Sequence, residues 1–121
     1  MVNIVDMKEN KLIAEFMGWE EIYKDASQLD YKFAKPNEII YRRNIDDLEY
    51  HISWDWLMSV VDKLEGIETD NGYYEFRIQL AETKIVDDHF ETWIEINEGD
   101  RFENTYLAVV EFIKEYNNQK T

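Results

Sequence analysis

Two short segments in which apolar and polar residues alternate constrain the fold of this chain more than any other feature. The first spans 73–80 and the second spans 90–96. A repeat of two residues is typical of a β-strand with one face in the core and the other in water. The connection 81–89 suits an antiparallel pair, in which we expect Arg77 to lie across from Glu91 or Glu95. The positions expected to face the core are Tyr74, Phe76, Ile78, Leu80, Phe90, Thr92, Ile94 and Ile96.

A third segment, 7–17, places apolar residues at the spacing of an amphipathic helix. Asp6 followed by Glu9 is typical of a capping box, in which two side chains satisfy free N–H groups at the start of a helix. Gly18 suits the end of this helix, because glycine readily adopts the left-handed conformation that follows many last turns. The sequence therefore predicts a first helix over about 7–17.

Two further helices are expected, one before and one after the pair of strands in the chain. Ser53 is a good N-cap for a helix over 54–65, and Gly66 supplies its end. Asn104 is the expected cap of the last helix, 105–116. The apolar residues of this last helix fall on one face, which predicts that the face is buried.

Between the first two helices, the segment 19–50 has no clear period. It contains the only proline, Pro36, and 38–41 is a candidate for a short edge strand. A connection this long is uncommon in a compact domain and often carries function. The order of elements favours an α+β fold of one domain, 1–121. We expect a small antiparallel sheet packed with three helices, as a two-layer or an α-β-α sandwich.

Acidic residues dominate the charge of this chain of 121 residues. It has 27 Asp and Glu against 13 Lys and Arg, which gives a formal net charge of -14. Hydrophobic residues still make up 45%, which is too many for a disordered acidic tail. Phosphate binding needs a cluster of Lys and Arg, and the sequence has none beyond Arg42 and Arg43. Direct binding to nucleic acid or to an anionic membrane is therefore not expected.

The residues offer little for covalent or metal chemistry. There is no cysteine, and the 4 glycines stand alone rather than in a phosphate-binding loop. His51 and His89 lack a second histidine at the spacing of helical metal sites, and Ser53 and Ser59 lack the glycine-flanked turn of a hydrolase serine. We expect no catalytic residue, no metal and no cofactor. A carboxylate pair between distant acids stays open, since the sequence does not single one out.

The densest acidic stretch, 87–103, holds seven carboxylates and only Arg101 opposes them. Trp93 lies within it, on the strand face that also carries charge, where we expect it either to be partly exposed or to belong to a second core. An aromatic residue among acids is typical of a protein-binding hot spot, and a negative surface speeds the encounter with a basic partner. We therefore predict a partner-binding surface. It consists of Asp87, Asp88, Glu91, Trp93, Glu95, Glu98, Asp100 and Glu103.

The long connection contains the alternative site. Arg42 and Arg43 form its basic island, Tyr41 precedes them, and Trp19 begins the segment. These four residues are the expected ligand contacts if the protein sequesters a signalling nucleotide. A rise in stability on adding nucleotide would identify this activity, because a ligand that binds only the native state stabilises it.

Residues 51–65, HISWDWLMSVVDKLE, resemble a group of small phage and prophage proteins of bacteroidete bacteria called the phage ABA sandwich domain. Residues 10–18, NKLIAEFMG, are similar to the start of that group, and residues 109–117, VVEFIKEYN, are similar to its final helix. The run SWDWLM is the most specific part of the match. The resemblance implies a helix–sheet–helix sandwich and a phage-type setting, and it implies no reaction.

Size, charge and resemblance favour a non-catalytic protein that binds and inhibits a host protein with a basic nucleic-acid-binding surface. An RNA- or DNA-guided defence nuclease is the sharpest form of this target, since carboxylates would occupy the place of phosphates. No signal peptide or bilayer-spanning run is visible, so we expect action in the host cytoplasm. The alternatives are a nucleotide sponge, a structural phage accessory domain that forms a homo-oligomer, and a hydrolase with paired carboxylates or a metal.

Overall fold

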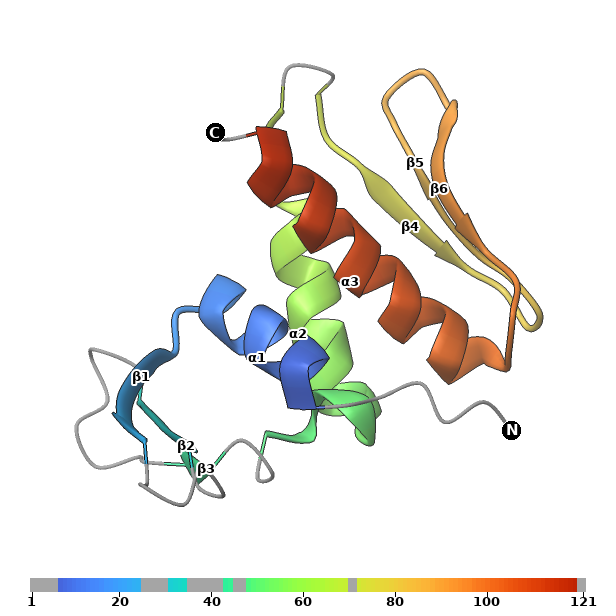
Figure 1. The fold of residues 1–121 in the computed structure, drawn as a ribbon. Coiled ribbons are helices and arrows are strands. Elements are labelled where there is room, and N and C mark those ends of the chain that lie inside the picture. Colours follow the sequence, from blue (N-terminus) through green and yellow to red (C-terminus); the bar gives the residue numbers. More distant parts are fainter. Residues whose placement is uncertain (1–6, 25–30, 35–42, 45–47, 70–71, 120–121) are drawn as a thin grey trace.

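The computed structural model describes residues 7–24, 31–34, 43–44, 48–69 and 72–119. These residues form an α+β fold in which the helices lie between two small antiparallel sheets, as Figure 1 shows. The expected fold class is confirmed. In chain order the elements are α1 (Met7–Phe16), β1 (Glu20–Lys24), β2 (Tyr31–Ala34), β3 (Arg43–Asn44), the 3-10 helix η2 (Glu49–His51), α2 (Trp54–Glu65), β4 (Glu75–Ile78), β5 (Thr83–Val86), β6 (Thr92–Ile96) and α3 (Arg101–Gln119).

The sheet of β4, β5 and β6 has one strand more than the alternation predicts. The outer strands β4 and β6 lie within the two expected segments, but the expectation that Leu80, Phe90 and Thr92 face the core is wrong, because all three are exposed. Strand β5 forms within the expected connection 81–89 and pairs antiparallel with both outer strands. The expected direct pairing of the two alternating segments is therefore wrong. Ile85 and Val86 of the central strand are buried, whereas β4 and β6 are the edges of the sheet.

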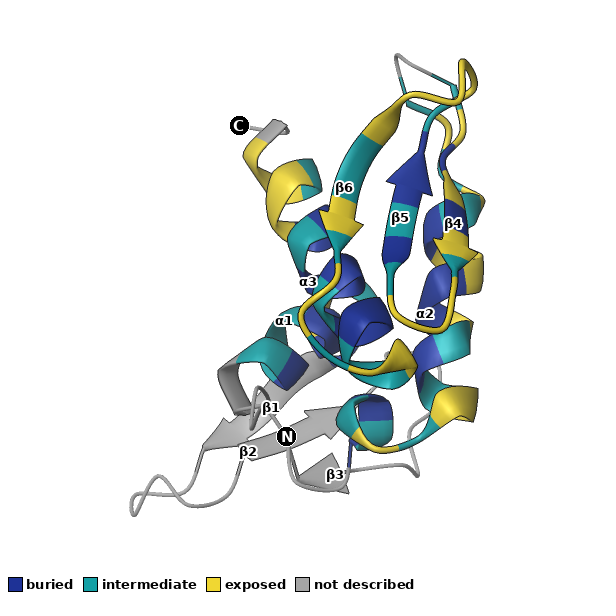
Figure 2. Cartoon of the chain, turned by 90° about the vertical axis from the view of Figure 1, so that its right-hand side faces the viewer, coloured by how far each residue is buried: buried dark blue, intermediate teal, exposed yellow. Residues whose placement is uncertain are grey.

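The sheet face that points away from the helices is charged and lies open to solvent. Arg77 lies across from Lys84, and Lys84 lies across from Glu95. The expected pairing of Arg77 with Glu91 or Glu95 is wrong, because β5 intervenes; Arg77 Nε instead donates to Glu75 Oε1 at 2.9 Å. Helices α2 and α3 cover the opposite face, and Figure 2 views the sheet from its charged side. No described helix lies over that side, so this sheet and the helices that cover it form two layers rather than an α-β-α sandwich.

A β-bulge at Trp93 changes the direction in which residues of β6 point. The register passes from Ile85 opposite Ile94 to Val86 opposite Thr92, so Trp93 has no partner residue on β5. An extra residue of this kind interrupts the alternation of a strand. Trp93 therefore lies on the core side of the sheet, and its expected place on the charged face is wrong.

The end of α1 is built as the sequence predicts. The Gly18 N–H donates to Glu15 O at 3.2 Å and the Trp19 N–H donates to Ala14 O at 2.9 Å, which is the pair of bonds of a Schellman motif. Gly18 has a φ of 95°, the left-handed conformation that this motif requires. The short-range signal of Gly18 therefore fixes where α1 stops and where the chain turns toward β1.

Replacing Gly18 with alanine is expected to lower the free energy of unfolding by about 1 kcal/mol, because an L residue is strained at positive φ. A Cβ at Gly18 would have no atom within 4 Å, so the loss measures the backbone conformation alone. Gly66→Ala is the matched control, since Gly66 ends α2 with a φ of -88° and its Cβ would make ordinary contacts. Urea unfolding of both variants checks the prediction, and equal losses would contradict it.

The cap of α2 is confirmed, whereas the cap of α3 is wrong. Ser53 Oγ accepts from the Trp56 N–H at 3.4 Å, so α2 begins at its expected residue. In α3 the cap is Asp100, whose Oδ1 accepts from the Glu103 N–H at 2.8 Å. The helix therefore begins one turn before the expected Asn104.

Asn104 has a different role, inside the first turns of α3. It is fully buried, its Oδ1 accepts from the Gly99 N–H and its Nδ2 donates to Gly99 O, both at 2.9 Å. These two bonds fix the loop between β6 and α3 against the helix. Asp100 caps the helix, and the side chain of Asn104 instead stabilises the loop between β6 and α3.

The segment 19–50 is more regular than its sequence indicates. Strands β1, β2 and β3 form a second antiparallel sheet in that order, with a bulge between Glu21 and Tyr23. Helix η2 precedes α2 and packs against it and against α1. The expectation of an irregular connection is therefore wrong for these strands, while Pro36 and the candidate strand 38–41 lie outside the described residues.

The core lies between the helices and the inner face of the β4–β6 sheet. Phe112 and Tyr106 of α3, Leu57 of α2 and Ile13 of α1 are all fully buried. Asn10 of α1 is also buried and hydrogen-bonds to Leu48 and His51, at the two ends of η2, and to Tyr106 of α3. Among the described helices, none combines the length and the apolar character that a bilayer-spanning segment needs.

Candidate protein-binding groove

The predicted acidic surface is distributed along β6 and the turns that flank it. Three of its carboxylates lie in the turn before β6, one lies on the strand, and three lie around the start of α3. They therefore follow the length of the edge strand rather than forming one compact patch. Asp87, Asp88 and Glu91 lie before β6, Glu95 lies on it, and the remaining three follow it. These three are Glu98, Asp100 and Glu103.

The turn before β6 uses one of its acids for its own structure. Asp87 Oδ1 accepts from the His89 N–H at 2.9 Å and from the Glu91 N–H at 3.0 Å. The carboxylate of Asp88 lies directly against Gly72, while Glu91 extends into solvent. Asp87 is thus occupied within the turn, and Asp88 and Glu91 stay accessible.

The acids at the other end of β6 are divided in the same way. Asp100 caps α3. Glu103 is half-buried, and its enclosed Oε2 has no hydrogen-bond partner among the described residues. Glu98 is exposed, and Glu95 is exposed with its Oε1 at 4.0 Å from Lys84 Nζ. Glu95 and Glu98 are therefore the accessible acids beside the strand.

Trp93 is part of the aromatic core rather than a freely exposed anchor. Its ring stacks on Tyr74 with the centroids 4.6 Å apart and meets the edge of Phe112 at 5.0 Å. Trp93 is nevertheless only half-buried, and its remaining surface forms one end of a groove. The tryptophan can contact a partner only along that groove.

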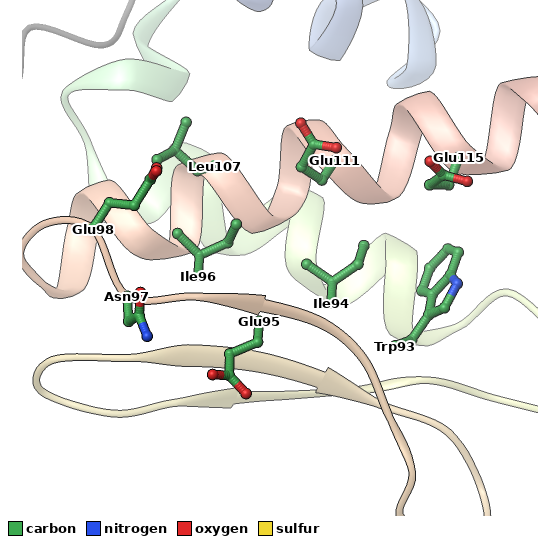
Figure 3. A pocket seen from close by; sticks show the side chains of 9 residues that line it. All are labelled: Trp93, Ile94, Glu95, Ile96, Asn97, Glu98, Leu107, Glu111 and Glu115. Carbon is green, nitrogen blue, oxygen red and sulfur yellow. The ribbon is translucent and has the colours of Figure 1, made fainter.

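This groove lies between the edge strand β6 and helix α3, and it has a volume of about 630 Å³. Figure 3 shows that β6 and α3 run side by side and that Ile94 and Ile96 point from the strand toward the helix. Leu107 lines it from the helix side. These three residues give the groove an apolar floor, and Trp93 closes one end.

Carboxylates surround this floor on several sides. Figure 3 places Glu111 and Glu115 on α3 and Glu98 on the loop after β6, while Glu95 points toward the opposite face of the sheet. Within the described part of the chain, Glu98, Glu111 and Glu115 form no ion pair. Like charges four residues apart on a helix destabilise it by about 0.2–0.5 kcal/mol, so the proximity of Glu111 to Glu115 does not stabilise α3. The arrangement is able to bind an extended, positively charged ligand.

Sequence reasoning did not identify Glu111 and Glu115 as site residues. Their signal is the spacing of four along α3, which puts Glu103, Leu107, Glu111 and Glu115 on one helical face. That spacing is visible in the sequence. The neighbour of this face is not visible, because only the folded chain places the edge of β6 beside it.

The alternative ligand site is only partly described. Trp19 is buried, with 6% of its surface exposed, and its Nε1 donates to Tyr50 Oη at 3.1 Å. It lines a depression of about 390 Å³ together with Trp56. Tyr41 and Arg42 lie outside the described residues, and of Arg43 only the backbone in β3 is described. The structure therefore does not bring these four residues together in one described site.

The two histidines occupy different settings. His51 Nδ1 lies 2.7 Å from Asn10 Nδ2, and because an amide nitrogen only donates, this ring nitrogen accepts. His89 is exposed in the turn before β6. Over the described ranges, no group of three or more His, Cys, Asp or Glu side chains is placed to hold a metal ion.

Comparison with protein-family models, with curated proteins and with solved structures finds no significant match to this chain.

Proposed function

We propose that this chain is a non-catalytic acidic protein that binds, and thereby inhibits, a partner with a basic nucleic-acid-binding surface. The observation that carries the proposal is the groove between β6 and α3, where Glu98, Glu111 and Glu115 have no ionic partner among the described residues. Glu98 and Glu115 are exposed and Glu111 is half-buried, so these carboxylates are available to pair with Lys and Arg of another protein. The net charge of -14 adds a long-range field of the same sign.

The proposed mechanism is occupation of a surface that otherwise binds phosphates. A nucleic-acid-binding protein holds the phosphate backbone with clusters of Lys and Arg. Carboxylates along the edge of β6 satisfy the same cations, while the apolar floor contributes buried area that a nucleic acid backbone does not offer. The partner then loses its nucleic acid by competition, and no covalent bond is made or broken.

The proposed setting is that of a small phage or prophage protein acting inside a bacterial cell. The resemblance proposed for residues 51–65 is the basis for this setting, and these residues run from His51, the last residue of η2, through α2. A guided defence nuclease is the sharpest candidate partner, because such an enzyme holds RNA and DNA in a positively charged channel. The cytoplasm of the host follows as the proposed compartment.

The test uses the immobilised protein and a host lysate, followed by purification of the captured protein. We expect the affinity of the captured protein for the acidic protein to fall by at least about tenfold as salt rises from about 50 to about 300 mM. Surface plasmon resonance measures this affinity. We also expect a saturating amount of the acidic protein to release labelled nucleic acid from the captured partner. Salt-independent binding, or a partner that keeps its nucleic acid, would contradict the proposed function.

A matched pair of variants makes this test specific to the groove. The groove variant carries Glu98→Gln, Glu111→Gln and Glu115→Gln, and the control carries three neutral replacements at exposed acids outside the groove. Both variants remove the same charge, so a difference between their affinities for the captured partner measures the local contribution of the groove carboxylates. The control replacements are Glu15→Gln, Asp62→Asn and Glu68→Gln.

A further inference from the structure

We propose that the free edge of β6 binds an extended, positively charged segment of the partner as an additional strand of the β4–β6 sheet. This inference rests on the proposed function and specifies how the partner is held. Main-chain hydrogen bonds to an edge strand are a recurring way to bind a peptide, with affinity from the backbone and specificity from alternate side chains.

The two edges of the sheet are not equally available. On β4, the Phe76 N–H already donates to Glu65 Oε2 of α2 at 2.8 Å, so part of that edge is satisfied within the chain. Strand β6 pairs only with β5 among the described strands. An edge strand presents alternate N–H and C=O groups to the outside, and Figure 2 shows β6 at the border of the sheet.

The edge of β6 lacks two common features that prevent pairing with another chain. Natural edge strands are often protected by proline or lysine, and Thr92–Ile96 contains neither. The bulge at Trp93 interrupts the register at one end, so the regular edge is Ile94–Ile96 and the residues that follow. A strand of this length suits the addition of a short peptide segment.

The groove determines which side chains the added strand must carry. A peptide beside β6 lies over the groove, so that every second side chain points toward α3. Glu111 and Glu115 are four residues apart on α3, which is about 6 Å along a helix axis. Two side chains that point the same way on a strand are about 6.8 Å apart. Since α3 runs along β6 (Figure 3), a basic–any–basic sequence places one cation near each carboxylate.

Long basic side chains also fit the remainder of the groove. The methylene stem of Lys or Arg packs on apolar surface while its charged end reaches a carboxylate. Ile94, Ile96 and Leu107 offer that apolar surface, and Glu98 provides a third carboxylate on the loop after β6. The occupant is therefore a segment in which every second residue is Lys or Arg.

A second copy of this chain fits the same edge poorly. Pairing β6 with β6 would bring two acidic grooves together in a protein whose net charge is -14. Like charges facing each other across an interface cost several kcal/mol. The groove therefore favours a cationic partner over self-association.

The test uses synthetic peptides of about ten residues in which lysine alternates with valine, labelled for fluorescence anisotropy. Two further versions carry N-methyl groups on all odd or on all even residues. Only one set of amides faces β6 in an added strand, so we expect one N-methylated version to lose about tenfold or more in affinity and the other to change little. Amide chemical-shift changes on β6 are expected to accompany binding.

The groove carboxylates are tested on the same peptides. Glu111→Gln with Glu115→Gln is expected to weaken binding of the alternating peptide by about tenfold, because two ion pairs are lost. The control with Glu15→Gln and Asp62→Asn removes the same charge from exposed sites on α1 and α2 and is expected to change affinity by less than about threefold. Circular dichroism of each variant verifies that the fold is kept.

The possible results separate this inference from the proposed function. If both N-methylated peptides and a peptide with its lysines in one block bind equally well, strand addition is wrong, although salt-dependent capture of a basic partner can still hold. If the alternating peptide binds on β6 but the captured partner keeps its nucleic acid, the proposed function is wrong instead. A dimer in analytical ultracentrifugation that masks β6 would overturn the inference in favour of a second copy.

Discussion

Replacing Phe112 with alanine is expected to lower the free energy of unfolding by about 3–5 kcal/mol. Phe112 is fully buried on α3, and its ring lies 5.0 Å from Trp93 and 5.5 Å from Tyr74. The ring of Phe76 lies 6.2 Å away and is nearly parallel to that of Phe112. The loss combines the transfer energy of the ring with the cavity that remains, because residues of the sheet relax only partly. Urea unfolding monitored by circular dichroism measures it.

The matched control is Phe90→Ala. The side chain of Phe90 is 73% exposed in the turn before β6, and its ring lies 5.4 Å from Arg77 Cζ. We expect this replacement to cost less than about 1 kcal/mol. If Phe112→Ala does not fold, Phe112→Leu provides a milder measurement at the same position. A loss at Phe112 no larger than that at Phe90 would contradict the packing described for α3.

The position of Phe112 also connects the core to the groove. Phe112 follows Glu111 in α3, and Trp93 rests on its ring while forming one end of the groove. The apolar part of the groove is therefore held in place by the core of the protein itself. A preformed surface loses less conformational entropy on binding than one that must become ordered.

Local chemistry explains which elements the sequence predicts correctly. Ser53 caps α2 and Gly18 ends α1 through hydrogen bonds to residues within five positions. Such bonds depend only on neighbours in the chain, so their signals are visible in the sequence. The start of α3 is the exception, because Asp100 and Asn104 are both good caps and only the burial of Asn104 decides between them.

Strand β5 and the bulge illustrate what local patterns do not determine. Thr83–Val86 is only four residues long, and Lys84 is its single outward-facing polar residue, so it offers too short an alternation to identify. The bulge at Trp93 depends on how β6 pairs with β5. Ile94 and Ile96 keep their expected face (Figure 3). The extra residue, however, turns Trp93 to the core side and leaves Thr92 exposed, which is why the sequence predicts the wrong face for Trp93.

The candidate site was predictable in its chemistry but not in its shape. The stretch 87–103 contains β6, and Trp93, Glu95 and Glu98 of that stretch are among the residues that line the groove. The other wall comes from Glu111 and Glu115, which belong to a helix that contacts β6 only in the folded chain. A tertiary contact of this kind has no signature in either segment alone.

Replacing Asn10 with alanine is expected to lower the free energy of unfolding by about 2–4 kcal/mol. Asn10 is 2% exposed, and its Oδ1 accepts from Tyr106 Oη at 2.7 Å. Its Nδ2 donates to Leu48 O at 3.0 Å and contacts His51 Nδ1 at 2.7 Å. Alanine cannot form any of these three hydrogen bonds. The groups that bonded to the Asn10 side chain therefore lose a hydrogen-bond partner. Chemical unfolding measures the loss.

A double-mutant cycle with Tyr106→Phe separates the bond from the cavity. Tyr106→Phe removes only the hydroxyl that donates to Asn10, and alone it is expected to cost about 0.5–1.5 kcal/mol. If the two side chains act through their shared bond, the double variant loses less than the sum of the single losses, by about 1 kcal/mol. Additive losses would show that Asn10 stabilises α1 mainly through Leu48 and His51. A loss below about 1 kcal/mol for Asn10→Ala would mean that water replaces its bonds, and that this contact does not hold α1 against α3.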